Sequence, residues 1–311
     1  MSSTPQSPSP VLPAGAPPGL GRPAAAAFGA YVIWGLFPLY FSALAAVPSL
    51  EVLADRILGS LVVLIFIAAG HRHRAEIRAV IARPRVLGLL CLSAVAIAAN
   101  WGVYIYAVQT GRAVDASLGY YVNPLVSVVL GVVFLRERPR AMQILAFFLA
   151  IGGVAWIAGE GGGLPWIAIA LAMSFGTYGL IRKQVPVGSL PGLTIESAIL
   201  LVPALGVAWY YAQSPAGSSF VQDIGLSLAI MLGGALTAFP LLLFAIAARK
   251  LPYSTLGFIQ FLAPSIVFIL GLTVFGEELN FAQAACFACI WAAAAIFVWD
   301  LWSRSRKPAA S

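Results

Sequence analysis

The sequence contains very little charge. Only 9% of its 311 residues are charged, whereas a soluble domain carries roughly 25%. Hydrophobic residues make up 61% of the chain, and the mean hydropathy is +0.94. So few charges cannot cover a surface that faces water. The composition therefore excludes a soluble globular protein and favours a helical membrane protein, whose apolar exterior is solvated by lipid.

Cysteine and histidine are also scarce, with three and two residues respectively. Cys286 and Cys289 have the C-x-x-C spacing, but no second pair or nearby His completes a metal site. His71 and His73 both lie in one basic segment, which we interpret as a solvated loop. The sequence has no H-E-x-x-H, G-x-S-x-G or nucleotide-binding motif. We therefore expect no cofactor, no metal and no enzymatic activity.

The basic residues are placed as topology signals. They occur singly between apolar runs, which excludes a nucleic-acid-binding surface despite the net charge of +7. If the N-terminus is cytoplasmic, nearly all of the 18 Lys and Arg residues fall on the cytoplasmic side. The exceptions are Arg112, in an outer loop, and Arg56, within a helix. This bias predicts that both termini are cytoplasmic and that the number of membrane helices is even.

Ten apolar segments follow a Pro-rich N-terminal region, and most reach the roughly 20 residues that a membrane helix needs. They run over about 25–46, 50–70, 86–109, 114–135, 141–159, 164–182, 192–211, 224–248, 253–275 and 280–302. We expect four regions: a disordered cytoplasmic tail at 1–24, two five-helix halves at 25–160 and 161–302, and a basic cytoplasmic tail at 303–311.

An internal repeat relates the two halves. The stretch 100–143 is similar to 249–283, and four identical pairs share an offset of 140 residues. The pairs are Pro124 and Pro264, Gly131 and Gly271, Glu137 and Glu277, and Gln143 and Gln283. Because each half has an odd number of helices, the halves must lie upside down relative to each other. Inverted repeats are typical of secondary transporters, with the substrate site between the halves.

Several short motifs occur in order along the chain: Trp34-Gly35, Val47-Pro48, Asn100-Trp101, Ala116-Ser117-Leu118-Gly119-Tyr120, Asn123-Pro124-Leu125, Tyr178-Gly179-Leu180-Ile181-Arg182-Lys183, Ile195-Glu196 and Ser254-Thr255-Leu256-Gly257-Phe258. These motifs resemble the RarD-type proteins of the EamA branch of the drug/metabolite transporter superfamily. The resemblance covers about residues 25–302. It implies ten transmembrane helices in two inverted EamA repeats and a carrier of the cytoplasmic membrane. RarD-type proteins carry a label of chloramphenicol sensitivity. Asp55 departs from the pattern, since such proteins often have His there.

Ionisable residues within membrane helices are candidates for gating or proton coupling, because charge is costly there. The candidates are Glu51, Asp55, Arg56 and Glu196. Glu51 and Asp55 share one helix face, so the pair could hold a proton. The alternative is structural: both acids suit the first turn of a helix, and Glu196 could reach the membrane interface.

Uncharged polar and aromatic residues define an expected substrate cavity. Buried amides need partners in a membrane, and aromatic rings supply apolar contact. The lining residues are expected to be Trp34, Asn100, Trp101, Tyr104, Tyr120, Asn123, Tyr178 and Gln260. Core packing or a membrane-interface belt is the alternative for each aromatic residue. The amide of Asn123 could instead satisfy backbone groups that Pro124 frees.

We therefore expect an all-α membrane protein that acts as a secondary transporter, and specifically an exporter, of small amphipathic metabolites or drugs by alternating access. Its partners would be a small-molecule substrate, the lipid bilayer and a coupling proton. The sequence leaves the oligomeric state open. A membrane-embedded group transferase and a passive channel are the alternatives; a channel would need a filter or charge ring, which the sequence does not display.

Overall fold

The computed structural model describes residues 21–67, 71–136, 141–159, 165–215, 217–221, 223–248 and 259–305. This part of the chain is helical and contains no strand, which confirms the all-α class. The helices are α1 (Gly21–Ala43), α2 (Ser49–Ile67), α3 (His71–Ile81), α4 (Pro84–Gln109), α5 (Ala113–Leu135), α6 (Ala141–Gly159), α7 (Trp166–Gln184), α8 (Ser189–Ala212), the 3₁₀ turn η1 (Ser219–Val221), α9 (Ile224–Ala248), α11 (Leu262–Thr273) and α12 (Phe281–Ser305).

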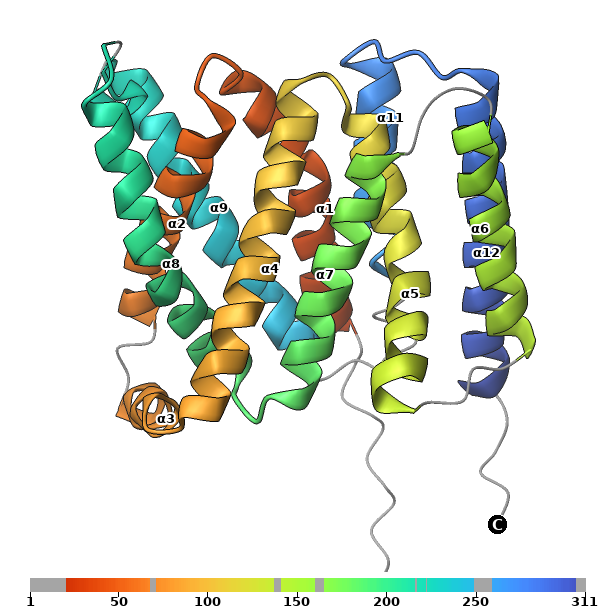
Figure 1. Ribbon diagram of the computed structural model, residues 1–311, viewed down its shortest axis with the longest axis horizontal. Helices are drawn as coiled ribbons and strands as arrows, with labels where there is room; N and C mark the ends of the chain where they lie inside the picture. Colours follow the sequence, from red (N-terminus) through yellow and green to blue (C-terminus); the bar gives the residue numbers. More distant parts are fainter. Residues whose placement is uncertain are drawn as a thin grey trace, which may run out of the picture.

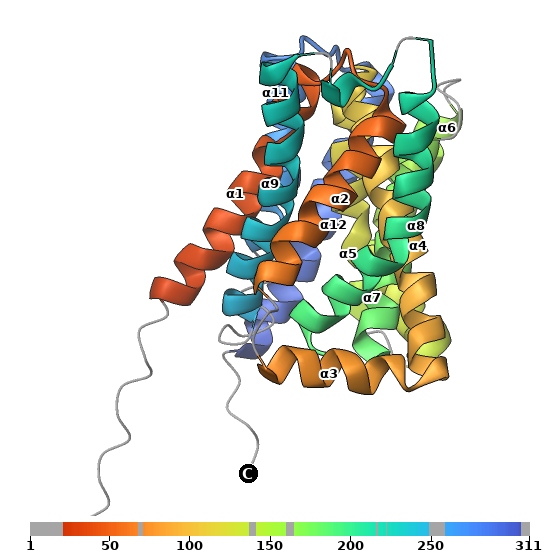
Figure 2. The same ribbon diagram turned by 90° about the vertical axis from the view of Figure 1, so that its left-hand side faces the viewer.

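The long helices stand side by side, and α3 lies across one end of them (Figures 1 and 2). We call this end the α3 face. The helix α1 begins at the α3 face and α12 ends there (Figure 1). The other end, which we call the opposite face, carries the turns after α1, α4, α8 and α11. The paired helices α6 and α12 form one edge of the molecule (Figure 1).

The helices lie where the apolar segments predict them. Each expected segment except the ninth coincides with a helix to within about one turn at either end. Only part of the ninth segment belongs to the described residues, where α11 begins at Leu262. Gln260 lies in the turn before α11, not within a helix as expected. The repeat residues Glu137 and Ser254–Phe258 lie outside the described residues.

The basic segment after α2 is not the solvated loop that the sequence suggested. It forms α3, whose residues Ile77 and Val80 pack against α4, α7 and α8. Arg74 and Arg78 remain exposed on its other side. The missed signal is the spacing of Ile77, Val80 and Ile81, which places three apolar residues on one helix face.

The helices are apolar enough for a membrane protein. In the described residues, three stretches could cross a membrane by length and composition: Pro23–Ala43, Pro84–Gln109 and Leu190–Ala212. Shorter apolar stretches occur in α6, α7, α9, α11 and α12. Side chains such as Phe66, Val202 and Ile224 are three-quarters exposed in the isolated chain, as expected if lipid covers them.

Glycine lets α2 and α9 approach closely. A Cβ atom on Gly234 would lie 2.7 Å from the carbonyl oxygen of Gly59 and 2.8 Å from its Cα. Any larger residue would force the two backbones apart. This contact positions Arg56 and Thr237, each three residues from one of the glycines, to meet across the helix pair.

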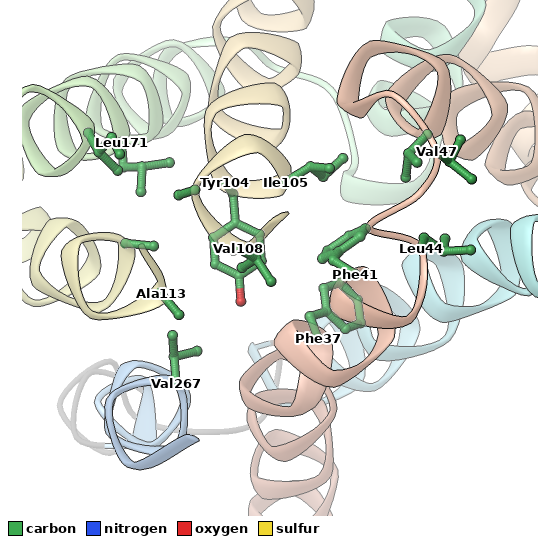
Figure 3. Packing of buried hydrophobic residues seen from close by; sticks show 14 of the residues in the cluster. Phe37, Phe41, Leu44, Val47, Tyr104, Ile105, Val108, Ala113, Leu171 and Val267 are labelled. Carbon is green, nitrogen blue, oxygen red and sulfur yellow. The ribbon is translucent and has the colours of Figure 1, made fainter. Parts of the chain in front are cut away.

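The largest buried cluster lies where α1, α4, α5, α7, α9 and α11 converge (Figure 3). Phe37 and Phe41 of α1 face Tyr104 of α4, while Leu171 of α7 and Val267 of α11 close other sides. The rings of Phe41 and Tyr104 meet edge to face, with centroids 5.9 Å apart. Arg56 and Asn100, two of the polar candidates for function, contact residues in or next to this cluster.

Candidate functional site

Arg56 is a buried charge that lies among the rings of α1 and α4. It lies on α2, about two turns from the helix N-terminus, and only 5% of it is exposed. Its Nε donates a hydrogen bond to the hydroxyl of Thr237 on α9, over 2.6 Å. Thr237 in turn donates to the backbone oxygen of Gly233. The Gly59–Gly234 contact holds these two side chains together.

Aromatic rings surround the guanidinium group of Arg56. Its Cζ lies 4.6 Å from the ring centroid of Trp101, 5.4 Å from that of Phe37 and 5.7 Å from that of Phe41. Such cation–π contacts offset part of the cost of burying a charge. Tyr40, Tyr104 and Tyr120 are also close enough to interact with it electrostatically.

The hydroxyl of Tyr104 is buried and has no hydrogen-bond partner among the described residues. Its ring contacts Phe41 on one side and Tyr120 on the other, with centroids 5.6 Å apart in the second pair. Buried hydroxyls are normally paired, so an unpaired one calls for an explanation. Here the phenol retains both its donor and its acceptor capacity close to Arg56.

Asn100 is engaged by protein groups. Its Nδ2 donates to the backbone oxygen of Leu171 (3.0 Å) and to the hydroxyl of Ser174 (3.1 Å), both on α7. Its Oδ1 accepts from the hydroxyl of Tyr120 on α5 (3.1 Å). Both N–H groups are therefore in use. Asn100 links α4, α5 and α7 and orients Tyr120, and it has no free donor for a substrate.

Glu51 and Asp55 both lie on α2 and interact electrostatically, but their carboxyl oxygens have different surroundings. The carboxylate of Glu51 is 99% buried and accepts three hydrogen bonds, from the Ser218 hydroxyl (2.9 Å), the Ser219 amide (2.7 Å) and the Ser219 hydroxyl (2.8 Å). It thereby fastens the turn before α9 to α2. Asp55 keeps one carboxylate oxygen, Oδ2, buried with no partner among the described residues.

Glu196 lies at a second polar site, near the α3 face. Its Oε1 accepts a hydrogen bond from the Ser93 hydroxyl on α4 (2.6 Å) and lies 3.8 Å from Nη1 of Arg182 on α7. Its Oε2 has no partner among the described residues. Tyr178 is near enough to interact electrostatically with both Glu196 and Arg182. The sequence placed Tyr178 in the cavity, and the structure places it beside this ion pair.

The other expected cavity residues are more scattered. Trp34 packs against Tyr31 and Phe244, with ring centroids 5.2 and 5.8 Å away. Asn123 is buried on α5, and its Oδ1 has no partner in the described part of the chain. Gln260 is half-buried. The structure therefore brings Arg56, Trp101, Tyr104, Tyr120 and Asn100 together. Trp34 packs against the same buried cluster as Tyr120, whereas Tyr178 lies at the second polar site.

Comparisons with known proteins agree with the fold and with this arrangement of helices. The profile of the EamA-like transporter family matches residues 22–159. The chain is 42% identical to the protein RarD of Streptomyces exfoliatus over 90% of this chain and 89% of that protein. It is 41% identical to an uncharacterized transporter of Pseudomonas aeruginosa, with 89% and 93% covered. The RarD protein of Escherichia coli is 40% identical, with 88% and 93% covered.

This protein belongs to the RarD-type EamA transporters.

A solved crystal structure has the same fold. It aligns with 92% of this chain and 99% of its own, with a TM-score of 0.53 and 19% sequence identity. Membership of the family makes the chain a membrane protein and a transporter, and a transporter implies a small-molecule substrate. Several relatives are named as uncharacterized transporters, which is consistent with transport rather than with a membrane-embedded enzyme.

Several functional contacts could not be anticipated from the sequence. Thr237, Phe37 and Phe41 contact Arg56, and Ser93 contacts Glu196, but none of them stands out among similar residues in apolar runs. The pair Gly233-Gly234 before Thr237 was the available signal, because paired glycines mark a close helix contact. The partners of Glu51, at positions 218 and 219, are even less conspicuous because they lie in a loop.

In the sequence, Glu277 stands out only as a member of the internal repeat. In the structure, its side chain forms hydrogen bonds with the backbone of α5. Its two carboxylate oxygens accept hydrogen bonds from the backbone N–H groups of Ala113 (2.6 Å) and Val114 (2.9 Å). It therefore caps the N-terminus of α5 from the turn between α11 and α12. Burial raises the pKa of Glu277, although the two N–H groups act in the opposite direction.

One apolar groove, with a volume of about 470 Å³, lies between α6 and α12. Gly152, Gly153 and Trp156 line one side, and Phe281, Ala285 and Cys289 line the other. None of these residues belongs to the cluster around Arg56. In the described residues no three His, Cys, Asp or Glu side chains gather as a metal site.

Proposed function

We propose that this chain is a secondary transporter that exports small amphipathic metabolites or drugs by alternating access, and that Arg56 and the rings around it form its substrate site. The observation that carries the proposal is the buried charge of Arg56 at the junction of α1, α2, α4 and α9. A charge that is buried at this depth in a membrane protein is costly unless it serves the transported molecule. Membership of a transporter family supports the same interpretation.

The two halves of the chain are proposed to be inverted repeats, with borders near residues 25, 160 and 302. The helix contacts support this proposal. In this arrangement α1, α2, α4, α5 and α6 correspond to α7, α8, α9, α11 and α12. The contact α5–α7 then corresponds to α1–α11, α4–α7 to α1–α9, and α2–α9 to α4–α8. All six of these contacts occur. The contacts α2–α8, α5–α11 and α6–α12 each pair a helix with its own counterpart. A two-fold axis between the halves requires this pattern.

The residues around Arg56 divide into two roles in this proposal. Trp101, Tyr104 and Tyr120 contact the substrate, because their rings are next to the guanidinium. Asn100 is a positioning residue that acts through the Tyr120 hydroxyl. Trp34, Asn123, Tyr178 and Gln260 belong to the path on either side of this site rather than to the site itself.

The acidic residues are proposed to control access and coupling. Glu51 and Glu277 hold turns of the opposite face in place, so they act as gate contacts. Asp55 and Glu196 each keep a buried oxygen without a partner among the described residues, as a carboxyl that exchanges a coupling proton requires. The α3 face, which carries the exposed residues Arg74 and Arg78, is proposed to face the cytoplasm, together with both termini.

Reconstituted vesicles provide the test. Wild-type protein should take up candidate organic solutes, chloramphenicol included, with saturation and with counterflow, since a carrier must return after each transport event. Asn100→Ala should lower uptake by about 5- to 150-fold, equivalent to the loss of a buried hydrogen-bonded amide. Asn280→Ala is the matched control, because Asn280 only caps the N-terminus of α12.

A linear, non-saturable flux without counterflow would identify a passive channel and overturn the carrier proposal. Normal uptake by Asn100→Ala would show that the cluster around Arg56 is not the substrate site. A large loss with Asn280→Ala would reveal that folding, not the site, controls the signal, so folded protein is quantified for each variant by size-exclusion chromatography.

A further inference from the structure

In the described part of the chain, no carboxylate forms an ion pair with Arg56. Among the described residues, no Asp or Glu oxygen lies within 4.0 Å of its guanidinium nitrogens. Glu51 is held by the turn at residues 218 and 219. Asp55, the preceding residue, interacts electrostatically with Glu51, and it forms no ion pair with Arg56 within 4.0 Å. Within the described ranges, the site is therefore a buried cation without an anion beside it.

Arg56 also has unused hydrogen-bond donors. Only Nε is hydrogen-bonded, to Thr237, so in the described part of the chain the terminal nitrogens Nη1 and Nη2 have no acceptor. These two nitrogens form the planar fork that binds a carboxylate through two parallel hydrogen bonds. The cation–π contacts with Trp101, Phe37 and Phe41 offset only part of the cost of burying the charge.

Tyr104 offers a second donor beside this fork. Its hydroxyl is buried without a partner in the described residues and interacts electrostatically with the guanidinium. In Figure 3 the ring extends from α4 with its hydroxyl at the tip, directed away from the α4 backbone. The neighbouring hydroxyl of Tyr120 is already used by Asn100. Two unsatisfied donors from different helices thus meet within one aromatic enclosure.

We infer that the substrate is a monovalent aromatic organic acid, whose carboxylate binds Arg56 and Tyr104 and whose ring packs against Trp101, Phe37 and Phe41. One negative charge balances the single cation, whereas a dianionic phosphate would leave a buried charge unpaired. The aromatic enclosure favours a flat apolar body over a sugar or a short polar acid. This inference names the substrate class and rests on the proposed transport function.

The first experiment measures binding by wild-type protein in nanodiscs. The ligands are benzoate, phenylacetate and indole-3-acetate, each compared with its neutral amide and with the corresponding amine. Thermal shift and quenching of tryptophan fluorescence report binding, since Trp101 lies in the site. At least one acid should bind about 10-fold or more tightly than its amide, and the amines should not bind.

The second experiment changes the two donors. Arg56→Gln should weaken binding of the preferred acid by about 10- to 150-fold and leave the weak binding of the amide unchanged, because the variant removes a charge-assisted interaction. Arg56→Lys should restore part of the affinity, as it keeps the charge but loses the fork. Tyr104→Phe should weaken binding by about 2- to 10-fold. Arg112→Gln is the control, because Arg112 pairs with Asp115 in a partly exposed turn.

The outcomes separate the inference from the proposed function. If the amides or amines bind as tightly as the acids, or if Tyr104→Phe and Arg56→Lys both bind the acid like wild type, the substrate class is wrong. Transport of a neutral or cationic panel member would then leave the carrier proposal standing. Conversely, acid binding that depends on Arg56, without uptake into vesicles, would support the site and overturn the transport function. If Arg56→Gln fails to fold, the ligand series and the Tyr104→Phe variant still test the inferred substrate class.

Discussion

Two buried glutamates, Glu51 on α2 and Glu196 on α8, occupy related helices in the proposed repeat and yet differ in their surroundings. Both are 99% buried, and both contact a serine from another helix or turn. Glu51 accepts three hydrogen bonds, and both of its oxygens are engaged. Glu196 accepts one bond from Ser93, and its Oε2 has no partner within the described residues.

The difference indicates separate tasks for the two carboxylates. A fully hydrogen-bonded carboxylate fixes its neighbours in one arrangement, which suits a contact that closes the opposite face. A carboxylate with an idle oxygen and a distant cation, Arg182 at 3.8 Å, can gain or lose a proton without breaking a network. Burial therefore does not distinguish these two acids, whereas the number of hydrogen bonds that each accepts does.

Removal of the Glu51 carboxylate should have the largest effect. Glu51→Ala leaves the Ser219 amide and two hydroxyls without an acceptor and should cost about 3 kcal/mol or more. Glu51→Gln keeps an acceptor and should cost about half as much. Thermal unfolding of the detergent-solubilised variants measures both. If Glu51→Ala were no less stable than Glu196→Ala, the contrast between a structural and a functional glutamate would be lost.

Glu196→Gln should have a moderate effect on stability and a specific effect on transport. It retains an acceptor for Ser93, so the loss should be about 1 kcal/mol. Because the amide cannot exchange a proton, uptake by this variant should depend less on pH than uptake by wild type, with Asp55 left as the other candidate for proton exchange. The pH profile of uptake is measured beside that of Glu51→Gln, which should keep the wild-type shape. An unchanged profile for Glu196→Gln would exclude Glu196 as the proton carrier.

Gly192→Ala probes the same glutamate through its cation. A Cβ on Gly192 would overlap the guanidinium of Arg182, with Cζ only 2.6 Å away. The flexible arginine should move aside, at a cost of about 1 kcal/mol, and Glu196 should lose its positive neighbour. Uptake should then shift in its pH dependence without losing it. Gly206→Ala on the same helix, where a Cβ meets nothing within 4 Å, is the matched control.

The smallest effect is expected from Glu277→Gln, which extends the comparison to the turn after α11. Because burial raises the pKa of Glu277 in the folded state, the folded protein binds a proton more readily than the unfolded chain. Its contribution to stability should therefore be largest at low pH and decline as the pH rises through the raised value. The difference in unfolding temperature between wild type and Glu277→Gln should decline between pH 4.5 and pH 7. The decline should correspond to about a few tenths of a kcal/mol in the free energy of unfolding. A flat difference would contradict it.

The local pattern of apolar residues in the sequence determines where the helices of this protein lie. Apolar runs of about 20 residues specify membrane helices without reference to the rest of the chain, because lipid is the partner of their exposed side chains. The segments containing α4, α5 and α12 were accordingly located to within a few residues. The segment of α3 was misjudged because its many basic residues outweighed the spacing of Ile77 and Val80, which pack against α4, α7 and α8 in the structure.

Only the tertiary structure decides which polar side chains have hydrogen-bond partners and which have none among the described residues. Arg56 meets Thr237 across 181 residues of sequence, and Glu51 meets Ser219 across 168. The sequence placed both Asn100 and Tyr104 in the expected substrate cavity, but the Asn100 amide is bonded to α7, whereas the Tyr104 hydroxyl has no partner among the described residues. A hydrogen bond depends on about 0.5 Å in the distance between two atoms. Such precision comes from the packing of α2 on α9 and of α4 on α7, and hydropathy carries no information about it.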